Sequence, residues 1–374
     1  MQWLVLSLLL TVTACDSPDR SRSEEPARRP GEKEGSFAKR LCLTRPGASE
    51  PCVTYARHLA FATGGLRRDV KAATTRLRNL CEKKVIAACT LLGEWYHFGS
   101  PLSRSSAKAR YYLQQSCGGK SPLGCTLLAE TIMGTGASRD VLLRLFTIGC
   151  AGKIPRACLR AGQTTRSIGS RESLWWFEEG CRLKDPASCT ELAVNLLETH
   201  QAGTSSRAMK ILHGECDGKW ARACYLLSSI HPDSPRAHGF LERSCALRFA
   251  PACGLMGRRN IGAAKSDKER ARAISTLHLA CHQDDRDSCL FLAKMYQKTA
   301  TTGSDRTRVI DYLVRACLLD HLASCENLFH YATSLADPLK RRWTGSLIRR
   351  GCDTHLIPHL CFLASILPHP QPPR

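Results

Sequence analysis

Cysteine is the side chain with the most chemical potential in this sequence of 374 residues, which contains 21 cysteines. Cysteine thiolates act as nucleophiles and metal ligands, and two thiols can be oxidised to a disulfide. Eight cysteine pairs share the spacing Cys-x7-Cys, and two pairs with a similar spacing flank them. Structural zinc sites use cysteines roughly two to four residues apart, and no Cys-x-x-Cys redox pair occurs. The pattern therefore favours structural disulfides formed in an oxidising compartment.

Backbone geometry constrains how these cysteines bond. Residues eight apart in one continuous helix are separated by about 12 Å of rise. A disulfide requires Cα atoms within about 7 Å, so a turn must lie between two cysteines that bond. Intervening residues such as Gly118, Gly119 and Pro122 favour such a turn. The predicted disulfides are Cys42–Cys52, Cys81–Cys89, Cys117–Cys125, Cys150–Cys158, Cys181–Cys189, Cys216–Cys224, Cys245–Cys253, Cys281–Cys289, Cys317–Cys325 and Cys352–Cys361.

Two Ser-x-x-Lys matches raise a catalytic alternative. They run from Ser36 to Lys39 and from Ser105 to Lys108. In serine β-lactamases such a serine is the nucleophile, and Ser-Asp-Asn and Lys-Thr-Gly groups complete the site. The sequence contains neither of these groups. We therefore predict no catalytic residue, and a β-lactam hydrolase is the alternative.

Two histidines suggest a second kind of chemistry. His278 and His282 lie four residues apart, so a helix would present both imidazoles on one face, with Asp284 and Asp285 nearby. This set would suit a hydrolytic zinc ion. The alternative, which we favour, is a solvated helix end with charged capping residues. We accordingly predict no metal and no cofactor.

Two further groups have simpler interpretations. His355 and His359 are also four apart, but Pro358 between them interrupts a regular helix, so we expect surface residues. Trp175-Trp176-Phe177 is the largest aromatic cluster. Its last residue occupies a core position, and we expect the two tryptophans to pack in the core as well. The alternative is an exposed first tryptophan that anchors a binding partner.

The elements that carry these residues repeat along the chain. Successive Cys-x7-Cys pairs begin 29 to 36 residues apart, a period that indicates a helical solenoid. An apolar residue lies four positions before each first cysteine, and a small or β-branched residue usually lies eight positions before it. This spacing predicts an amphipathic helix that ends at the cysteine. After most second cysteines, an apolar residue at +3 and a small residue at +4 begin the next helix, where the small residue allows close helix packing.

One repeat carries a family resemblance. The segment from Leu92 to Gly99 resembles the first helix of Sel1-like repeats, which has the pattern Leu-Gly-x-x-Tyr-x-x-Gly. The segment from Ala107 to Cys117 resembles the second helix, with Lys-Ala-x-x-Tyr-Tyr. The added Cys-x7-Cys is similar to that of the Helicobacter cysteine-rich protein branch. The resemblance covers about residues 40–366 and is weakest in 155–180 and 224–260, where the Tyr and Gly landmarks are missing.

The resemblance implies an all-α fold and an adaptor function. The expected architecture is an αα-hairpin solenoid, a right-handed superhelix of about nine Sel1-like or TPR-like repeats with disulfides between hairpins. A protein or peptide partner is expected on its concave face. The same branch also carries a penicillin-binding or β-lactamase label, which supports the catalytic alternative above.

The N-terminal residues predict export and a lipid anchor. A short apolar run ends in Val12-Thr13-Ala14-Cys15, which resembles the lipobox of bacterial lipoproteins. The resemblance implies that Cys15 receives the lipid, and the remaining 20 cysteines then form ten pairs. We expect a signal peptide over 1–14, a lipidated disordered tether over 15–38, the solenoid over 39–366 and a Pro-rich tail over 367–374. The chain would be anchored on the periplasmic face or the cell surface.

Net charge indicates the chemistry of the partner. The formal net charge is +21, which favours acidic partners. Basic runs at Lys340-Arg341-Arg342 and Arg349-Arg350 would meet anionic lipid or polysaccharide, or form a solvated face. Because the chain is exported, we do not expect nucleic acid as a partner. We predict a monomeric scaffold that binds an acidic protein or peptide.

Overall fold

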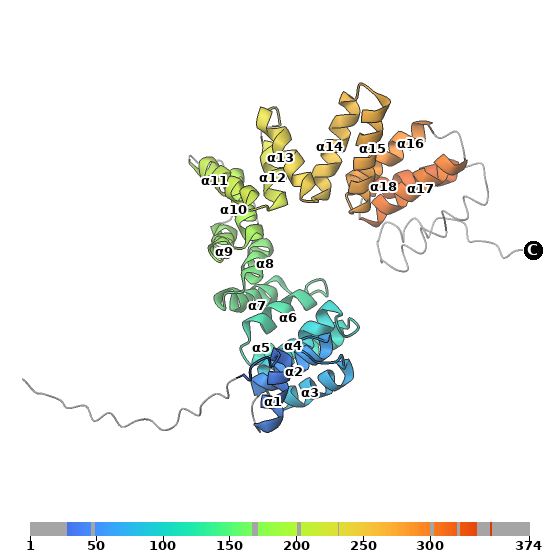
Figure 1. The fold of residues 1–374 in the computed structure, drawn as a ribbon. Coiled ribbons are helices and arrows are strands. Elements are labelled where there is room, and N and C mark those ends of the chain that lie inside the picture. The colour runs from blue at the N-terminus through green and yellow to red at the C-terminus, as the bar shows by residue number, and fades with distance from the viewer. Residues whose placement is uncertain are drawn as a thin grey trace, which may run out of the picture. The chain divides into compact units, whose positions relative to one another are not determined.

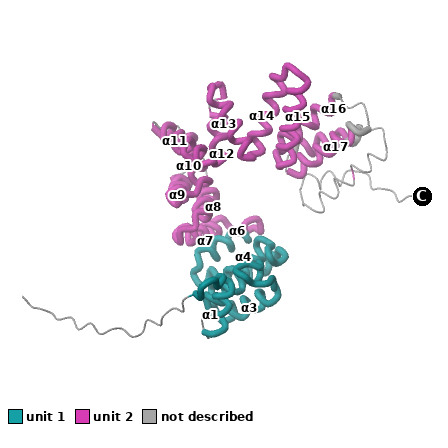
Figure 2. Tube along the Cα trace, in the orientation of Figure 1, with its two compact units in different colours: residues 1–132 teal, residues 133–374 magenta. Residues whose placement is uncertain are grey.

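A computed structural model describes residues 28–45, 49–166, 171–199, 203–230, 232–299, 303–319 and 322–334, together with Gly345. Across these residues the chain forms 18 α-helices and no strand, so the predicted all-α fold is confirmed (Figure 1). The chain divides into two compact units, Met1–Ile132 and Met133–Arg374 (Figure 2). The lipobox with Cys15, the pair Cys352–Cys361, His355, His359 and the basic runs after residue 338 lie outside the described residues.

Within each unit, helices that follow one another in the sequence pack against each other. The helices of the first unit are α1 (Glu34–Thr44), α2 (Ser49–Phe61), α3 (Val70–Glu82), α4 (Ile86–Phe98), α5 (Ser106–Gly118) and α6 (Pro122–Ile132). Those of the second unit are α7 (Arg139–Ala151), α8 (Pro155–Thr165), α9 (Arg171–Arg182), α10 (Pro186–Glu198), α11 (Thr204–Asp217), α12 (Ala221–Ile230), α13 (Pro235–Ala246), α14 (Ala250–Ala263), α15 (Asp267–His282), α16 (Arg286–Thr299), α17 (Gly303–Leu318) and α18 (Leu322–Ser334).

The core consists of the positions that the sequence period selects. In each described Cys-x7-Cys repeat, the apolar residue four positions before the first cysteine is 2% exposed or less. Where a small or β-branched residue lies eight positions before that cysteine, it is buried to the same degree. The first set is Leu77, Leu113, Phe146, Phe177, Leu212, Leu241, Leu277 and Leu313. The second set is Ala73, Ala109, Ala208, Ala237, Ala273 and Val309. The predicted amphipathic phase is therefore confirmed.

The small residue at +4 after the second cysteine packs against the large core residue of the following helix. A Cβ added to Gly162 would lie 2.5 Å from the Phe177 ring, and one added to Gly93 would lie 2.5 Å from Leu113. Real Cβ atoms do not approach other atoms this closely, so the two helices in each pair are in direct backbone-to-side-chain contact. The close approach predicted from the small residues is present.

Nine disulfides form among the described cysteines, all between the partners that the spacing predicted. The Cα atoms of bonded cysteines lie 4.5–4.8 Å apart, so a turn separates them as expected. Each bridge joins the end of one helix to the first turn of the next. On the chain-entropy description, closing a loop of this length stabilises the fold by about 2.5 kcal/mol.

The backbone between paired cysteines adopts one conformation in seven successive turns. The N–H three residues after the first cysteine donates to the carbonyl of that cysteine, at 2.8–3.1 Å. The next N–H donates to the carbonyl of the residue before the cysteine, at 2.9–3.2 Å. These two bonds define a Schellman motif, which ends a helix through a residue in the left-handed region.

That left-handed position is usually glycine, but here it has a side chain in each of the seven turns. The φ angles are between 60° and 66°, and the residues are Lys84, Lys120, Lys153, Lys184, Lys219, Arg248 and Asp284. A residue with a Cβ costs roughly 1–2 kcal/mol more than glycine in this conformation. The turns therefore store local backbone strain that the hydrogen bonds and disulfides offset.

The N-terminal boundary of the folded part differs slightly from expectation. Helix α1 begins at Glu34, so the last five residues assigned to the tether (34–38) are helical. The buried side chain of Ala38 and the N–H of Ser36, which donates to the Gly64 carbonyl at 3.2 Å, attach this helix to the turn after α2. Among the described helices, none combines the length and the apolar character needed to cross a bilayer.

The Gly162 contact generates a stability prediction. We expect Gly162→Ala to destabilise the chain by about 1–3 kcal/mol, because the new methyl group would overlap the rigid Phe177 ring. Thermal or urea unfolding followed by circular dichroism measures this change.

Gly239→Ala is the matched control. Gly239 lies inside α13, and a Cβ there would meet no described atom within 4 Å. The control should stabilise the chain by about 0.5–1 kcal/mol through helix propensity. If both substitutions stabilised the chain, the close packing of α8 on α9 would be refuted.

Candidate binding surface

The first unit contains a cavity of about 910 Å³ beside α3 and the Cys42–Cys52 disulfide. Four basic side chains and one acidic side chain contribute to its lining: Arg45, Lys71, Arg76, Lys83 and Asp69. The lining positions on α3 recur every three to four residues, so they form the face of the helix opposite its buried leucine and alanine side. The cavity therefore has an excess of positive charge on a helical wall.

Local structure reduces the effect of the one acidic group. Asp69 is the N-cap of α3, and its Oδ1 accepts a hydrogen bond from the N–H of Ala72 at 2.8 Å. A carboxylate in this position is stabilised by the helix dipole. The negative charge of Asp69 is thus already compensated by the helix end.

Arg76 occupies the middle of the cavity wall. Its Nη1 lies 3.5 Å from the Cys42 sulfur, and its guanidinium lies 5.0 Å from the centroid of the Tyr55 ring. These contacts hold the side chain in place from two helices. Its Nε is buried and has no hydrogen-bond partner among the described atoms. The guanidinium as a whole lies in the cavity lining, where it contributes a positive charge.

A cluster of two tyrosines and two basic residues lies in the same unit. Tyr96 and Tyr112 stack with ring centroids 5.8 Å apart, and Arg78 donates to the Tyr96 hydroxyl at 3.2 Å. The Lys108 ammonium lies 5.4 Å from the Tyr96 ring, within the range of a cation–π contact. Burial raises the pKa of Tyr112, so its hydroxyl stays protonated.

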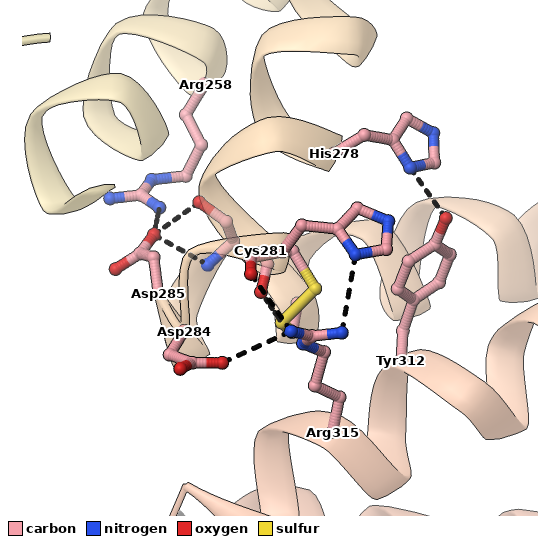
Figure 3. Close-up of a disulfide and its surroundings, with 10 residues drawn as sticks. Arg258, His278, Cys281, Asp284, Asp285, Tyr312 and Arg315 are labelled. Carbon is pink, nitrogen blue, oxygen red and sulfur yellow. Dashed lines mark hydrogen bonds and ion pairs between the residues drawn. A yellow bond between two sulfur atoms is a disulfide. The ribbon is translucent and has the colours of Figure 1, made fainter. Parts of the chain in front are cut away.

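The second unit contains the same cluster with histidine in place of Arg78. Tyr296 and Tyr312 stack at 5.8 Å, and Arg308 lies 5.9 Å from the Tyr296 ring. His278 binds both hydroxyls. Its Nε2 lies 3.1 Å from the Tyr296 hydroxyl, and its Nδ1 lies 2.7 Å from the Tyr312 hydroxyl (Figure 3). The corresponding residues of the two clusters are each 200 positions apart, and each set has the same offsets from its cysteines.

The environment of His278 disfavours its charged form. Burial lowers the pKa of His278 below the ordinary value of a histidine, and the nearby His282 and Arg308 charges lower it further. A neutral imidazole donates with one nitrogen and accepts with the other, so one tyrosine donates to it and the other accepts. Protonation would turn both nitrogens into donors.

The four residues that suggested a zinc site do not converge. His278 is directed to Tyr296 and to Tyr312 (Figure 3). By contrast, the Nδ1 of His282 lies 3.3 Å from Nη1 of Arg315. Asp284 accepts from Arg315 at 3.2 Å. In the described parts of the chain, no three His, Cys, Asp or Glu side chains are grouped to hold a metal ion.

The fourth residue of that hypothesis, Asp285, has a structural role. It is 8% exposed and accepts hydrogen bonds from the backbone and the hydroxyl of Ser288 at the start of α16. Arg258 lies 3.9 Å away on α14. Packing therefore directs these side chains to different partners, so the four residues do not form one set of ligands in the described structure.

The Ser-x-x-Lys matches also have structural contacts. The Ser105 hydroxyl is the N-cap of α5 and accepts from the N–H of Lys108 at 3.4 Å. The Lys108 ammonium is directed to Tyr96, as described above. Ser36 and Lys39 lie on α1, where the Ser36 N–H bonds to the turn after α2.

The aromatic cluster on α9 differs from expectation. Phe177 is fully buried and Trp176 is 8% exposed, but Trp175 is 55% exposed and contacts Trp176 edge-to-face. The prediction that both tryptophans pack in the core was wrong for Trp175. Two residues along a helix rotate a side chain by about 200°, so Trp175 and the core residue Phe177 point to opposite sides.

The cavity was not found from the sequence. The basic residues that line it are scattered between positions 45 and 83, while the sequence analysis considered only contiguous basic runs. The available signal was the spacing of Lys71, Arg76 and Lys83 on the face of α3 away from its core residues. This spacing does not reveal that the Cys42–Cys52 disulfide also lines the cavity.

Comparison with known proteins supports the fold. The sequence matches no protein-family model and no curated protein. Its structure is similar to that of c5321, a protective antigen with an SLR fold from uropathogenic Escherichia coli, at 12% identity and a TM-score of 0.53 over 89% of this chain and 74% of that one. It is also similar to a Sel1 repeat protein from Oxalobacter formigenes, at 16% identity and a TM-score of 0.51 over 78% of this chain and 88% of that one.

These similarities establish the architecture. The chain has the fold of Sel1-type helical repeats, with a disulfide between the helices at each described repeat junction. Sel1 and TPR-like repeat folds typically mediate protein–protein interaction. At this level of identity, the binding partner has to be inferred from the surface of this chain.

The His278 cluster generates a prediction on pH. Because the folded-state pKa of His278 is lowered, the unfolded chain takes up the proton first as pH falls. The free energy of unfolding should therefore decrease from about pH 6.5 downward, until the pH falls below the folded-state pKa. Urea unfolding at pH 7.5 and 5.5 measures this decrease.

Substitutions isolate the contribution of His278. His278→Gln retains a donor and an acceptor without a titrating group, so the difference in stability between the two pH values should shrink. His213→Gln, on the half-buried His213 that contacts Phe240, is the control and should keep the wild-type difference. An unchanged difference in His278→Gln would disprove the assignment.

Proposed function

We propose that this protein is an exported, lipid-anchored scaffold whose cavity beside α3 binds an acidic segment of a protein or peptide partner. The observation that carries the proposal is the cationic wall of that cavity, formed by Lys71, Arg76 and Lys83. We expect no cofactor in this function, and we expect the chain to be a monomer.

The cationic side chains of this wall are suited to binding carboxylates. The guanidinium of Arg76 lines the cavity and can form charge-assisted hydrogen bonds to a carboxylate. Lys71 and Lys83 lie on either side along the helix and provide flexible charges. A peptide with successive Asp or Glu residues can contact all three cations at once.

The rigidity of the wall favours binding. Arg76 is held by Tyr55 and the Cys42 sulfur, and the Cys42–Cys52 bridge connects α1 to α2 at the edge of the cavity. A site that is ordered before binding loses little conformational entropy when the partner binds. This supports a binding role for the cavity.

The cellular location is part of the proposal. The disulfides indicate an oxidising, exported compartment, because the cytosol keeps thiols reduced. The Cys15 lipobox, outside the described residues, would attach the chain to the periplasmic face or the cell surface. The binding surface would then be presented to exported or extracellular partners.

A peptide titration tests the cavity. The probe is a fluorescein-labelled peptide of eight glutamates, and fluorescence anisotropy measures its affinity for the full chain. In Lys71→Gln/Arg76→Gln/Lys83→Gln, the affinity should fall by about 10-fold or more, because three charge contacts are lost.

The control removes the same number of charges from the same unit. Lys39→Gln/Arg57→Gln/Arg67→Gln replaces three exposed side chains that do not line the cavity, and it should lower the affinity by less than about 3-fold. Equal losses in both variants would show that the peptide responds only to net charge and would overturn the proposal. Circular dichroism of each variant checks that it is folded.

A separate experiment tests the anchor. Expression in a bacterial host with radiolabelled palmitate should label the wild-type chain and place it in the membrane fraction. Cys15→Ser should lose both the label and membrane association, because the thiol that would carry the lipid is absent. Labelling of the Cys15→Ser chain would contradict lipidation at this residue.

A further inference from the structure

Six of the seven left-handed turn residues carry a positive charge. They are Lys84, Lys120, Lys153, Lys184, Lys219 and Arg248, and we refer to them as the turn cations. All six side chains are exposed. Each lies three residues after the first cysteine of a pair, in the Schellman motif described above. The charge therefore recurs at one structural position of the repeat.

Local backbone energetics do not explain this choice. Glycine is the preferred residue at this position of a Schellman motif, and asparagine is the usual second choice. Lysine and arginine gain no conformational advantage there, and their aliphatic chains differ in length and end group. The property that these residues share is the positive charge, which interacts favourably with the C-terminal end of the preceding helix. Strained backbone positions of this kind often cluster at functional sites.

The turn cations are not used to stabilise the fold through ion pairs. Among the described residues, none of the six has an acidic partner. Arginines close to them in sequence do: Arg182 pairs with Glu179, and Arg243 pairs with Asp217. The seventh turn residue, Asp284, is acidic and pairs with Arg315 at 3.2 Å (Figure 3). The positive charges of the turn cations are thus available to an external partner.

In the second unit the turn cations occur in four consecutive repeats. They are Lys153, Lys184, Lys219 and Arg248, and the helices between them pack successively, α7 on α8 through α13 on α14. Each of these turns joins the two helices of the same kind of pair, so one turn cation recurs in each successive repeat. A disulfide holds the backbone of each of these turns.

We propose that the turn cations of the second unit bind a linear anionic polysaccharide. A polymer with regularly repeated carboxylates can contact cations on successive repeats with one chain, and each further contact becomes intramolecular. The oxidising compartment indicated by the disulfides favours a polysaccharide over nucleic acid.

The experiment uses polygalacturonate, a linear polymer of uronic acids, and calorimetry with the full chain. In Lys153→Gly/Lys184→Gly/Lys219→Gly/Arg248→Gly, we expect affinity to fall by about 10-fold or more. The same variant should have an unchanged or higher melting temperature, because glycine relieves the strain of the left-handed turns. Loss of binding in this variant would therefore not be a result of unfolding.

Two further variants sharpen the test. Replacing the three lysines by arginine, in Lys153→Arg/Lys184→Arg/Lys219→Arg, keeps the charge and should keep the affinity within about 3-fold. Lys210→Gln/Arg236→Gln/Arg259→Gln/Lys268→Gln removes four exposed helical charges from the same unit and should change the affinity by less than about 3-fold.

Three outcomes would overturn the proposal. The first is wild-type affinity in the glycine variant, and the second is an equal loss in the helical control. The third is tighter binding of the wild-type chain to double-stranded DNA, or to vesicles of phosphatidylglycerol and phosphatidylcholine in equal parts, than to polygalacturonate. The acidic-peptide test of the first unit uses substitutions at other residues, none of which is a turn cation.

Discussion

Closure of an eight-residue span by a disulfide is the constraint on which the rest of the structure depends. In a continuous helix the two cysteines would be about 12 Å apart, whereas bonded cysteines here have Cα atoms less than 5 Å apart. The first helix must therefore end within three residues of the cysteine, and the Schellman motif provides that ending. Because each turn closes in the same way, the register of the next helix is also set, and the core positions repeat. Helices of 10 to 16 residues are marginal on their own, and the chain has few aromatic residues with which to enlarge its core.

Repetition of one packing arrangement also allows equivalent positions to be compared within one molecule. The two clusters differ at Arg78, which corresponds to His278, and at Lys108, which corresponds to the equally charged Arg308. Arg78 and His278 occupy the same position, each against a stacked pair of tyrosines. The guanidinium of Arg78 stays charged and donates to Tyr96, whereas the imidazole of His278 bridges both tyrosines in its neutral form. The stacked tyrosine pairs of the two clusters have nearly the same geometry. The first cluster therefore has a permanently charged group, and the second a titrating group, because of the side chain at this one position. The second cluster therefore gains sensitivity to pH without any change in the helices around it.

The sequence predicted those features that depend on local geometry. Leu77 and Ala73 are buried because the helical period places them on one face, and the cysteine partners follow from the length of the span between them.

Contacts between distant residues were not predictable in this way. Arg76 reaches the Cys42 sulfur across 34 positions, and no periodic pattern indicates that contact. The contacts of His278 with Tyr296 and Tyr312, on the two following helices, were not predicted for the same reason. The exposure of Trp175 follows from the helical phase that buries Phe177, so this error came from treating adjacent aromatic residues as one unit.

Disulfides and turn charges are connected through the energy of the backbone. A lysine in an unconstrained turn would leave the left-handed region, because its Cβ is too close to the following carbonyl oxygen. In Lys84 and its equivalents, the two Schellman hydrogen bonds and the adjacent disulfide hold the backbone in that region. The covalent bridge thus permits a side chain at a position where a weaker turn would require glycine. A repeat of this kind can carry a charge at each junction without losing its register, whereas a repeat without the bridge would have to give up either the charge or part of its stability. The density of cysteines and the regular placement of exposed cations are therefore two consequences of the same turn.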